Sequence, residues 1–304
     1  MDRNVAAALA RIPFLAGKNI AESERLGGLT NLVYRIRHNG ADYLLRIPGE
    51  GTSAYIDRAV EAHNARVAAE AGVSAEVLFS DPSDGLMVSR YIGGAATMNA
   101  ERFRDPGACR RAAQAFRRMH RCGKDFRSVF DVFAKMDEYL ALLATLKAPV
   151  PDGYDAVKRE ADSVRRALAA HPAPLAPCHC DPLAENFLDT GERMWIVDWE
   201  YSGNNDPMWD LGDLSVEAGF GAEQDAALMT AYFEGEPPAD QLGRMVMCKA
   251  MCDLLWTLWG VIQHANKNPA DDFWAYAVNR FARCQALMGE ADFPRHVKAV
   301  ERGR

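Results

Sequence analysis

Several patterns that would assign a chain to a large protein class are missing from this sequence. Its seven cysteines are an odd number, and no two of them have Cys-x-x-Cys spacing. A disulfide framework or a zinc site built from paired cysteines is therefore not expected, and reduced thiols in the cytoplasm fit better. The chain also has no Gly-Lys-Ser or Gly-Lys-Thr, so a Walker-type phosphate loop is excluded.

Long apolar runs and blocks of basic residues are equally scarce. Residues 1–12 lack an apolar core of signal-peptide length, and we expect that no later run approaches the length of a membrane span. The formal net charge is −7, and the arginine pairs alternate with apolar residues. This pattern predicts solvated helix faces and gives no nucleic-acid footprint. We expect neither membrane insertion nor a nucleic-acid partner, and we leave a homodimer open.

What the sequence does contain is a change from strand to helix patterns near residue 92. Before it, apolar alternation predicts five strands, and residues 54–71 predict one helix. After residue 101, apolar residues recur at helical spacing up to residue 287. With 304 residues, 49% of them hydrophobic, the chain can form two packed lobes. We expect an α+β fold, with a small lobe over residues 1–92 and a mostly helical large lobe over residues 93–304.

The stretch over residues 178–210 holds the most specific polar pattern. Asn186 follows Asp181 by five residues, and Asp198 lies twelve residues further on. Short apolar runs on either side of residues 189–192 predict a hairpin, whose ends would bring Asn186 and Asp198 to one point. Two oxygen ligands there suit Mg²⁺, which keeps water and phosphate in its other positions. Asp181, one loop away, can receive a proton from a hydroxyl.

The same spacing occurs in kinase catalytic loops. The motif reads His179-x-Asp181 with Asn186, then Ile196-Val-Asp198-Trp-Glu200-Tyr201. It resembles the choline/ethanolamine kinase branch of the aminoglycoside-phosphotransferase-like kinases, from about residue 24 to about residue 276. The resemblance implies a protein-kinase-like fold, in which the small lobe has a five-stranded antiparallel sheet and one helix. It also implies ATP and Mg²⁺ as cofactors, and phosphorylation of the hydroxyl of choline or ethanolamine, a small amino alcohol. Asp181 would be the catalytic base, and Asn186 and Asp198 the metal ligands.

A glycine turn near the N-terminus is the candidate phosphate loop. Gly27-Gly28-Leu29-Thr30-Asn31 lies between two predicted strands. Glycines let backbone N–H groups approach a phosphate closely, but the segment also fits an ordinary hairpin turn. It resembles the phosphate-covering loop of choline kinases, which implies nucleotide contacts from Gly27, Gly28, Thr30 and Asn31.

A charge in the third predicted strand points to a second nucleotide contact. Arg46 is the lone charge among apolar neighbours, and a buried charge needs a partner. The next helix offers Glu61, and kinases use a strand cation paired with a helix glutamate to hold ATP phosphates. We predict an Arg46–Glu61 ion pair, although Arg58 could also satisfy Glu61.

The segment between the lobes predicts a hinge. Ile92-Gly93-Gly94 breaks the strand pattern directly after the fifth strand. Adenine would hydrogen-bond there to backbone groups near Ser89 and Tyr91.

Aromatic and acidic residues after the hairpin predict the substrate pocket. Trp256 and Trp259 share a helix face, and Tyr276 lies on the following helix. Aromatic faces attract quaternary ammonium groups, although tryptophans at helical spacing also fit a buried core. The Trp-x-x-Trp-Gly sequence looks like the choline pocket of the family, in which one acid would neutralise the cation. The expected substrate contacts are Glu200, Tyr201, Asp213, Glu217, Trp256, Trp259 and Tyr276.

Two other functions stay open at this point. A related kinase for an aminoglycoside or amino sugar would share the catalytic loop but need a wide acidic cleft. A non-catalytic kinase relic would only hold a cationic metabolite, and the intact Asp181, Asn186 and Asp198 set argues against it. Turnover of choline compared with kanamycin separates the two kinase activities.

Overall fold

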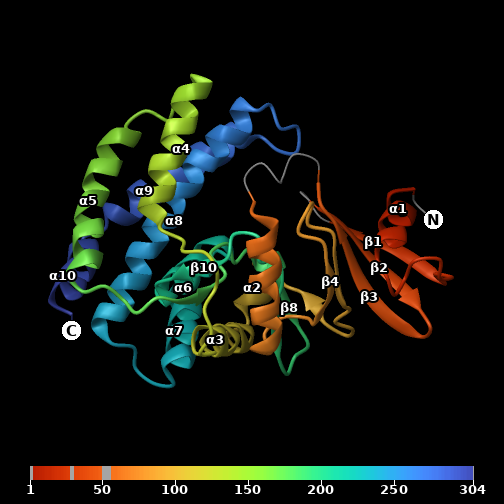
Figure 1. The fold of residues 1–304 in the computed structure, drawn as a ribbon. Coiled ribbons are helices and arrows are strands. Elements are labelled where there is room, and N and C mark those ends of the chain that lie inside the picture. Colours follow the sequence, from red (N-terminus) through yellow and green to blue (C-terminus); the bar gives the residue numbers. More distant parts are fainter. Residues whose placement is uncertain (1–2, 28–30, 50–55, 304) are drawn as a thin grey trace.

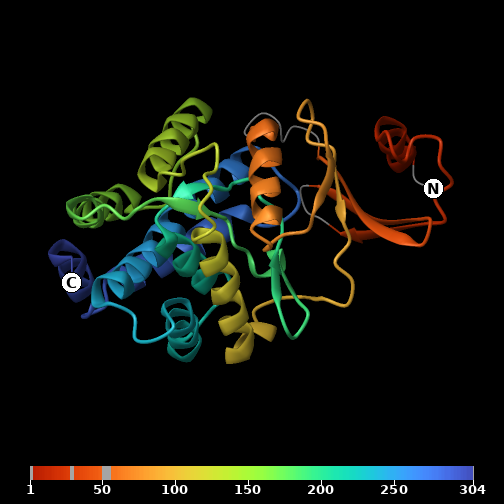
Figure 2. The same cartoon turned by 60° about the horizontal axis from the view of Figure 1, so that its bottom comes forward.

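A sheet and a bundle of helices lie at opposite ends of the molecule, with helix α2 (Arg58–Glu70) between them (Figures 1 and 2). The computed structural model describes residues 3–27, 31–49 and 56–303. Its five-stranded sheet is antiparallel, as predicted, in the order β1-β2-β3-β5-β4. The strands are β1 (Glu22–Gly27), β2 (Leu32–His38), β3 (Ala41–Ile47), β4 (Val77–Ser80) and β5 (Met87–Arg90).

The small lobe has its own apolar core beneath helix α1 (Arg3–Arg11), at the end remote from the helical bundle (Figure 1). Val5 and Leu9 lie one turn apart on α1 and are both buried. They pack in one cluster with Ile36 and Leu45 from the strands. This burial explains why a short N-terminal helix stays on the sheet.

Helix α2 connects the two lobes through its packing. It begins after Asp57, whose side chain accepts the N–H groups of Ala59 and Val60 and thereby caps the first turn. The predicted start at residue 54 is outside the described residues. Ala65 and Ala68 on its buried face belong to the apolar core of the large lobe. The helix that carries Glu61 is therefore fixed to the helical side of the molecule.

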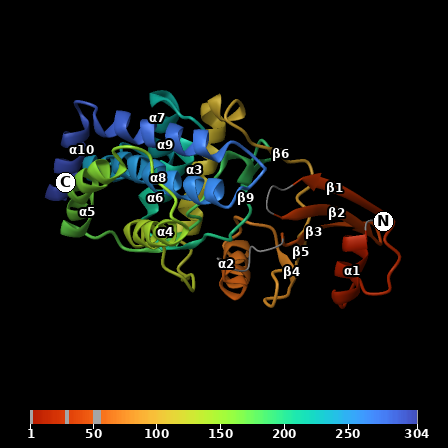
Figure 3. The same ribbon diagram turned by 90° about the horizontal axis from the view of Figure 1, so that it is seen from above.

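The large lobe is built around one long helix, α8 (Ala239–Ala265), which crosses the bundle between α4 and α9 (Figure 3). By length and composition α8 could cross a membrane, so the expectation that no run approaches this length was wrong. However, 83% of its most apolar window is buried inside the protein, as in a core helix. The other helices are α3 (Pro106–His120), α4 (Val132–Leu146), α5 (Tyr154–Ala170), α6 (Pro207–Glu217), α7 (Ala222–Phe233), α9 (Phe273–Met288) and α10 (Phe293–Arg302).

Helix α10 was missed by the sequence analysis, although Phe293, Val297 and Val300 follow a helical period. Start signals elsewhere were reliable: Asp206 caps α6 by accepting the N–H of Met208, as its position before Pro207 suggests. The boundary of the lobes at residue 92 stays an interpretation.

Two small sheets connect the bundle to the centre of the molecule. The predicted hairpin is confirmed: β8 (Phe187–Asp189) pairs antiparallel with β9 (Met194–Ile196). The chain that leaves the small lobe adds β6 (Ala96–Thr97) to this hairpin. Strand β7 (Ala176–Cys178) pairs with β10 (Gly203–Asn205). The catalytic loop thus leaves β7 and enters the hairpin, between two paired elements.

Candidate active site

A fully buried carboxylate holds the loop that precedes Asp181. Asp210 on α6 accepts the backbone N–H groups of His179 and Cys180 at 2.8 and 2.9 Å, and it lies 2.9 Å from Nε2 of His120. Cys180 has φ of 67°, a left-handed conformation that non-glycine residues adopt only when their surroundings hold them. Asp210 therefore fixes the backbone at the point where the loop presents Asp181.

Asp181 lies in a strongly acidic environment. Burial raises the pKa of Asp181 well above its usual range. Glu217 and Asp198 raise this pKa further through their charge, and Arg280 opposes them. A cation bound nearby would lower the pKa of Asp181 and favour its ionised form, which is the form that can accept a proton.

The hairpin places the two predicted metal ligands at one end. The N–H of Val197 donates to the carbonyl of Asn186 at 2.9 Å, so Asp198 follows directly beside Asn186. The side-chain amide of Asn186 donates its N–H to the carbonyl of Asp181 at 3.2 Å, which leaves its oxygen for a ligand. Asp198 itself has φ of 68°, another left-handed residue at this site. The structure thus brings together the oxygen ligands that the spacing predicts.

His179 connects the loop to the end of the hairpin. Its Nε2 lies 2.9 Å from the carbonyl of Val197, and its ring packs 4.8 Å from that of Trp199. Burial lowers the pKa of His179, so the neutral form is favoured.

The predicted ion pair between Arg46 and Glu61 is confirmed. Arg46 also lies 3.4 Å from Oδ1 of Asp198, and Arg58 binds Glu61 at 2.8 Å, so Glu61 has both partners. Burial alone would lower the pKa of Arg46, but the carboxylates of Glu61 and Asp198 outweigh it and the net shift is upward. This network links the small-lobe strand and helix to the metal-binding end of the hairpin.

Glu200 belongs to the same charged network. Its carboxylate lies 3.6 Å from Arg58 and accepts a hydrogen bond from the buried Asn31 at 3.5 Å. Burial, followed by the charge of Asp198, raises the pKa of Glu200 to about 7. Asn31 therefore connects the end of the predicted phosphate loop to the site. Gly28 and Thr30 of that loop lie outside the described residues, and Gly27 ends β1.

Backbone N–H groups directly before the predicted hinge are hydrogen-bonded within the protein. Ser89 pairs with Leu44 inside the sheet. The N–H groups of Arg90 and Tyr91 already donate, to Glu76 at 2.9 Å and to Asp42 at 3.3 Å. These two N–H groups are therefore already used within the protein, and adenine binding near Ser89 and Tyr91 stays a prediction.

The aromatic residues predicted for the substrate form one cluster. Ring centroids are 5.6 Å apart for Tyr201 and Trp256, 6.3 Å for Trp256 and Trp259, and 5.7 Å for Trp259 and Tyr276. All three pairs meet edge to face, the arrangement that ring quadrupoles favour. A side chain at Gly260 would place its Cβ 2.7 Å from the Tyr276 ring, so the glycine after Trp259 lets α9 approach α8.

Two acids of α6 lie on the same face of their helix and share neighbours on α8 and α9. The thiol of Cys252 donates to Asp213 at 3.1 Å and lies 3.9 Å from Glu217. Arg280 binds Glu217 through two nitrogens at 2.5 and 2.8 Å and covers the ring of Tyr276 at 4.8 Å. The guanidinium of Arg280 therefore already contacts Glu217 and Tyr276, two of the residues predicted to bind the cation of the substrate.

Comparison with known proteins adds to this geometry. Residues 23–242 match the phosphotransferase enzyme family. A choline/ethanolamine kinase family protein from Mesorhizobium loti is 60% identical in sequence, and its solved structure superposes with a TM-score of 0.91 over 98% of each chain. The chain belongs to the choline/ethanolamine kinase family.

Other family relatives carry either substrate name. The choline kinase LicA from Streptococcus pneumoniae is 28% identical, with a TM-score of 0.74 over 89% of this chain and 94% of that one. Ethanolamine kinase 2 from Mus musculus is 26% identical over 78% of this chain and 68% of its own length. The family resemblance read from the sequence is thus confirmed, and the protein is a kinase of a small molecule.

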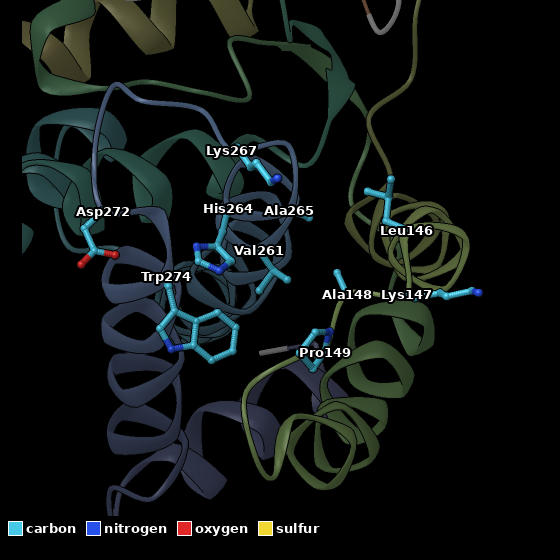
Figure 4. Close-up of a pocket in the computed structure, with 10 residues that line it drawn as sticks. All are labelled: Leu146, Lys147, Ala148, Pro149, Val261, His264, Ala265, Lys267, Asp272 and Trp274. Carbon is cyan, nitrogen blue, oxygen red and sulfur yellow. The ribbon is translucent and has the colours of Figure 1, made fainter.

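A hollow in the large lobe lies apart from this kinase site. It has a volume of about 770 Å³ and is lined by the turn between α4 and α5, the end of α8 and the start of α9 (Figure 4). His264 and Trp274 lie next to each other on one side of it, with ring centroids 5.5 Å apart. Its lining includes none of the site residues predicted from the sequence.

Sequence reasoning missed three residues that shape the kinase site. The sequence patterns assign no role to Asp210, Cys252 or Arg280. The one available signal was a polar residue inside an apolar helix pattern, which α8 shows at Cys252-Asp253. Their roles depend on partners from distant parts of the chain.

Proposed function

We propose that this kinase uses MgATP to phosphorylate the hydroxyl of a small amino alcohol, choline or ethanolamine. The observation that carries the proposal is a wall of aromatic and acidic side chains, part of which interacts with Asp181. The wall consists of Tyr201, Trp256, Trp259, Tyr276, Asp213 and Glu217. Asp213, Glu217 and Tyr276 lie close enough to Asp181 for their charges to interact with it. An amino alcohol presents a cation and a hydroxyl within a few bonds of each other. The wall would bind the cation, and Asp181 would receive the hydroxyl proton as the oxygen attacks the γ-phosphorus.

The oxygen ligands at the hairpin fit Mg²⁺. Carboxylate oxygens of Glu61, Asp198 and Glu200 lie within 4.8 Å of one another. These three carboxylates outnumber the two arginines that contact them, Arg46 and Arg58. Burial raises the pKa of Asp198, the charge of Arg46 opposes this shift, and the charge of Glu61 adds to it. Asn186 and Asp198 would hold the ion, which when bound would neutralise charge on the transferring phosphate. Glu61 meanwhile keeps Arg46 directed toward the phosphate side.

The chain's own residues would supply mainly position and charge. Asp210 fixes the loop, His179 supports the hairpin, and Arg46 would bind phosphate oxygens. These groups are in place before substrate enters, and such preorganisation is the main source of rate in phosphoryl transfer. We also propose a cytoplasmic location, in keeping with the seven free cysteines.

ADP release tests this function. Purified protein with MgATP is expected to release ADP in the presence of ethanolamine or choline, and not with kanamycin. The Asp181→Asn variant serves as the background, because it keeps the fold and loses the base. Equal ADP release by both proteins, or release with kanamycin alone, would reject the amino alcohol assignment.

A further inference from the structure

Two buried polar atoms in the proposed substrate wall have no partner. Asp213 is 0% exposed and Trp256 is 5% exposed. Throughout the part of the chain that the structure describes, no atom hydrogen-bonds to Oδ2 of Asp213 or to Nε1 of Trp256. Buried polar groups are nearly always satisfied in folded proteins, so this acceptor and this donor are available to pair with a ligand.

Both atoms belong to the same region as Asp181. Cys252 donates to the other oxygen of Asp213 at 3.1 Å, and Trp256 follows Cys252 by one helical turn. The charge of Asp181 is close enough to affect the pKa of Asp213. The free oxygen of Asp213 therefore lies within the acidic group that surrounds the proposed base.

The other acid of α6 is already neutralised from within the protein. Arg280 binds both oxygens of Glu217, at 2.5 and 2.8 Å, and its guanidinium covers the face of Tyr276. Arg280 also lies 3.2 Å from Asp253. Glu217 and Tyr276 thus contact a cation directly. Among the described residues no arginine, lysine or histidine forms an ion pair with Asp213, and Arg280 acts on it only through its charge.

We infer that the free oxygen of Asp213 accepts a hydrogen bond from the substrate ammonium, so the kinase prefers amino alcohols that keep at least one N–H on nitrogen over quaternary ones. This inference rests on the proposed function and selects among its substrates. A protonated primary, secondary or tertiary amine can donate an N–H to this oxygen. The trimethylammonium group of choline cannot, and would leave a buried carboxylate oxygen unpaired.

A methylation series tests the inference. Values of kcat/KM are measured for ethanolamine, N-methylethanolamine, N,N-dimethylethanolamine and choline. The first three compounds, which all keep an N–H, are expected to agree within a few-fold. The last methyl group, which removes it, is expected to lower kcat/KM by about tenfold to a hundredfold. A value for choline equal to or above that for N,N-dimethylethanolamine overturns the inference and leaves the proposed function standing.

The variants Asp213→Asn and Glu217→Gln locate the effect. Asp213→Asn keeps the shape of the side chain and the acceptor for Cys252. It is expected to raise KM for the three N–H substrates about tenfold and to leave KM for choline within a few-fold. The fall in kcat/KM between N,N-dimethylethanolamine and choline, the step in the series, should therefore disappear. Glu217→Gln is the matched control on the same helix, and is expected to keep the step because Glu217 faces Arg280.

Two other results are decisive in different ways. If Asp213→Asn scales all four kcat/KM values equally, Asp213 has a structural role only and the inference is wrong. If the wild-type protein phosphorylates none of the four compounds, the proposed function fails and the inference fails with it.

Discussion

The carboxylate of Asp210 accepts the N–H of Cys180, the residue directly before the proposed base, at 2.9 Å. Asp210→Asn replaces one of its two acceptor oxygens with a donor, next to a backbone N–H. We expect kcat to fall by about a hundredfold, because small displacements of a reacting group carry large rate costs. The unfolding free energy should fall by about 1 to 3 kcal/mol.

A matched control separates these two effects. Asp225→Asn alters an acid on α7 that binds Ser215 and Lys249 and has no contact with the loop among the described residues. It should reduce stability and leave kcat unchanged. If Asp210→Asn loses stability with unchanged kcat, the loop does not depend on this carboxylate.

The metal end of the hairpin gives a second prediction. Asp198→Ala should lower kcat by about a hundredfold or more, because the proposed carboxylate ligand of the ion is removed. Added Mg²⁺ should not restore kcat fully. Asp189→Asn in the same hairpin is the control, because Asp189 binds Arg111 away from the site. Kinetics over a range of Mg²⁺ concentration checks both variants. Full recovery of Asp198→Ala at high Mg²⁺ would remove Asp198 from the ligand set.

The pH dependence of stability offers a third test, on Asp213. Burial, followed by the charges of Glu217 and Asp181, raises the pKa of Asp213 well above 3.8. The folded protein therefore binds this proton more tightly than the unfolded chain, and its unfolding free energy falls as pH rises from about 4 toward the raised pKa. Asp213→Asn does not titrate, so it should gain stability relative to wild type as pH rises.

Melting temperatures of both proteins between about pH 4 and about pH 8 measure this difference. The same groups, Glu217, Asp181, Cys252 and Arg280, surround position 213 in both proteins, so the comparison isolates the residue at that position. If the melting temperature of the wild-type protein rises relative to that of Asp213→Asn as pH increases, the folded state favours the ionised carboxylate and the prediction is wrong.

The aromatic wall gives a fourth prediction. Trp256→Leu and Trp259→Leu should each raise KM for the amine by the equivalent of about 0.5 to 2 kcal/mol and leave KM for ATP unchanged. Trp256 is buried, so its variant should also melt at a lower temperature. Trp274→Leu, in the separate hollow, is the control and should change neither KM. Lower melting temperatures with unchanged KM for the amine would mean that both indoles are only core.

Much of this architecture could be predicted from local patterns. The hairpin around residues 189–192, the Asp206 cap and the α8 period depend on neighbours within a few residues, which the sequence displays directly. The Arg46–Glu61 pair was predictable because a lone charge in an apolar strand needs a partner. The spacing of kinase catalytic loops then predicted which residues form the catalytic loop and the metal site.

The remaining features depend on packing between distant segments. Nothing in the spacing shows that Arg280 on α9 binds Glu217 on α6, or that Asp42 accepts the N–H of Tyr91. Such contacts follow from the crossing of helices and the edges of sheets, which local periodicity does not determine. For the same reason, the sequence could not distinguish Asp213 from Glu217 as the acid left for a substrate.

Direct identification of the product tests the central claim. Wild-type protein and Asp181→Asn are incubated with MgATP labelled at the γ-phosphate and with ethanolamine or choline, and the products are separated and identified. The account predicts labelled O-phosphorylated amino alcohol from the wild-type protein, and at least about a hundredfold less from Asp181→Asn. Label that stays in ATP or appears only as free phosphate, or equal product from both proteins, would contradict it.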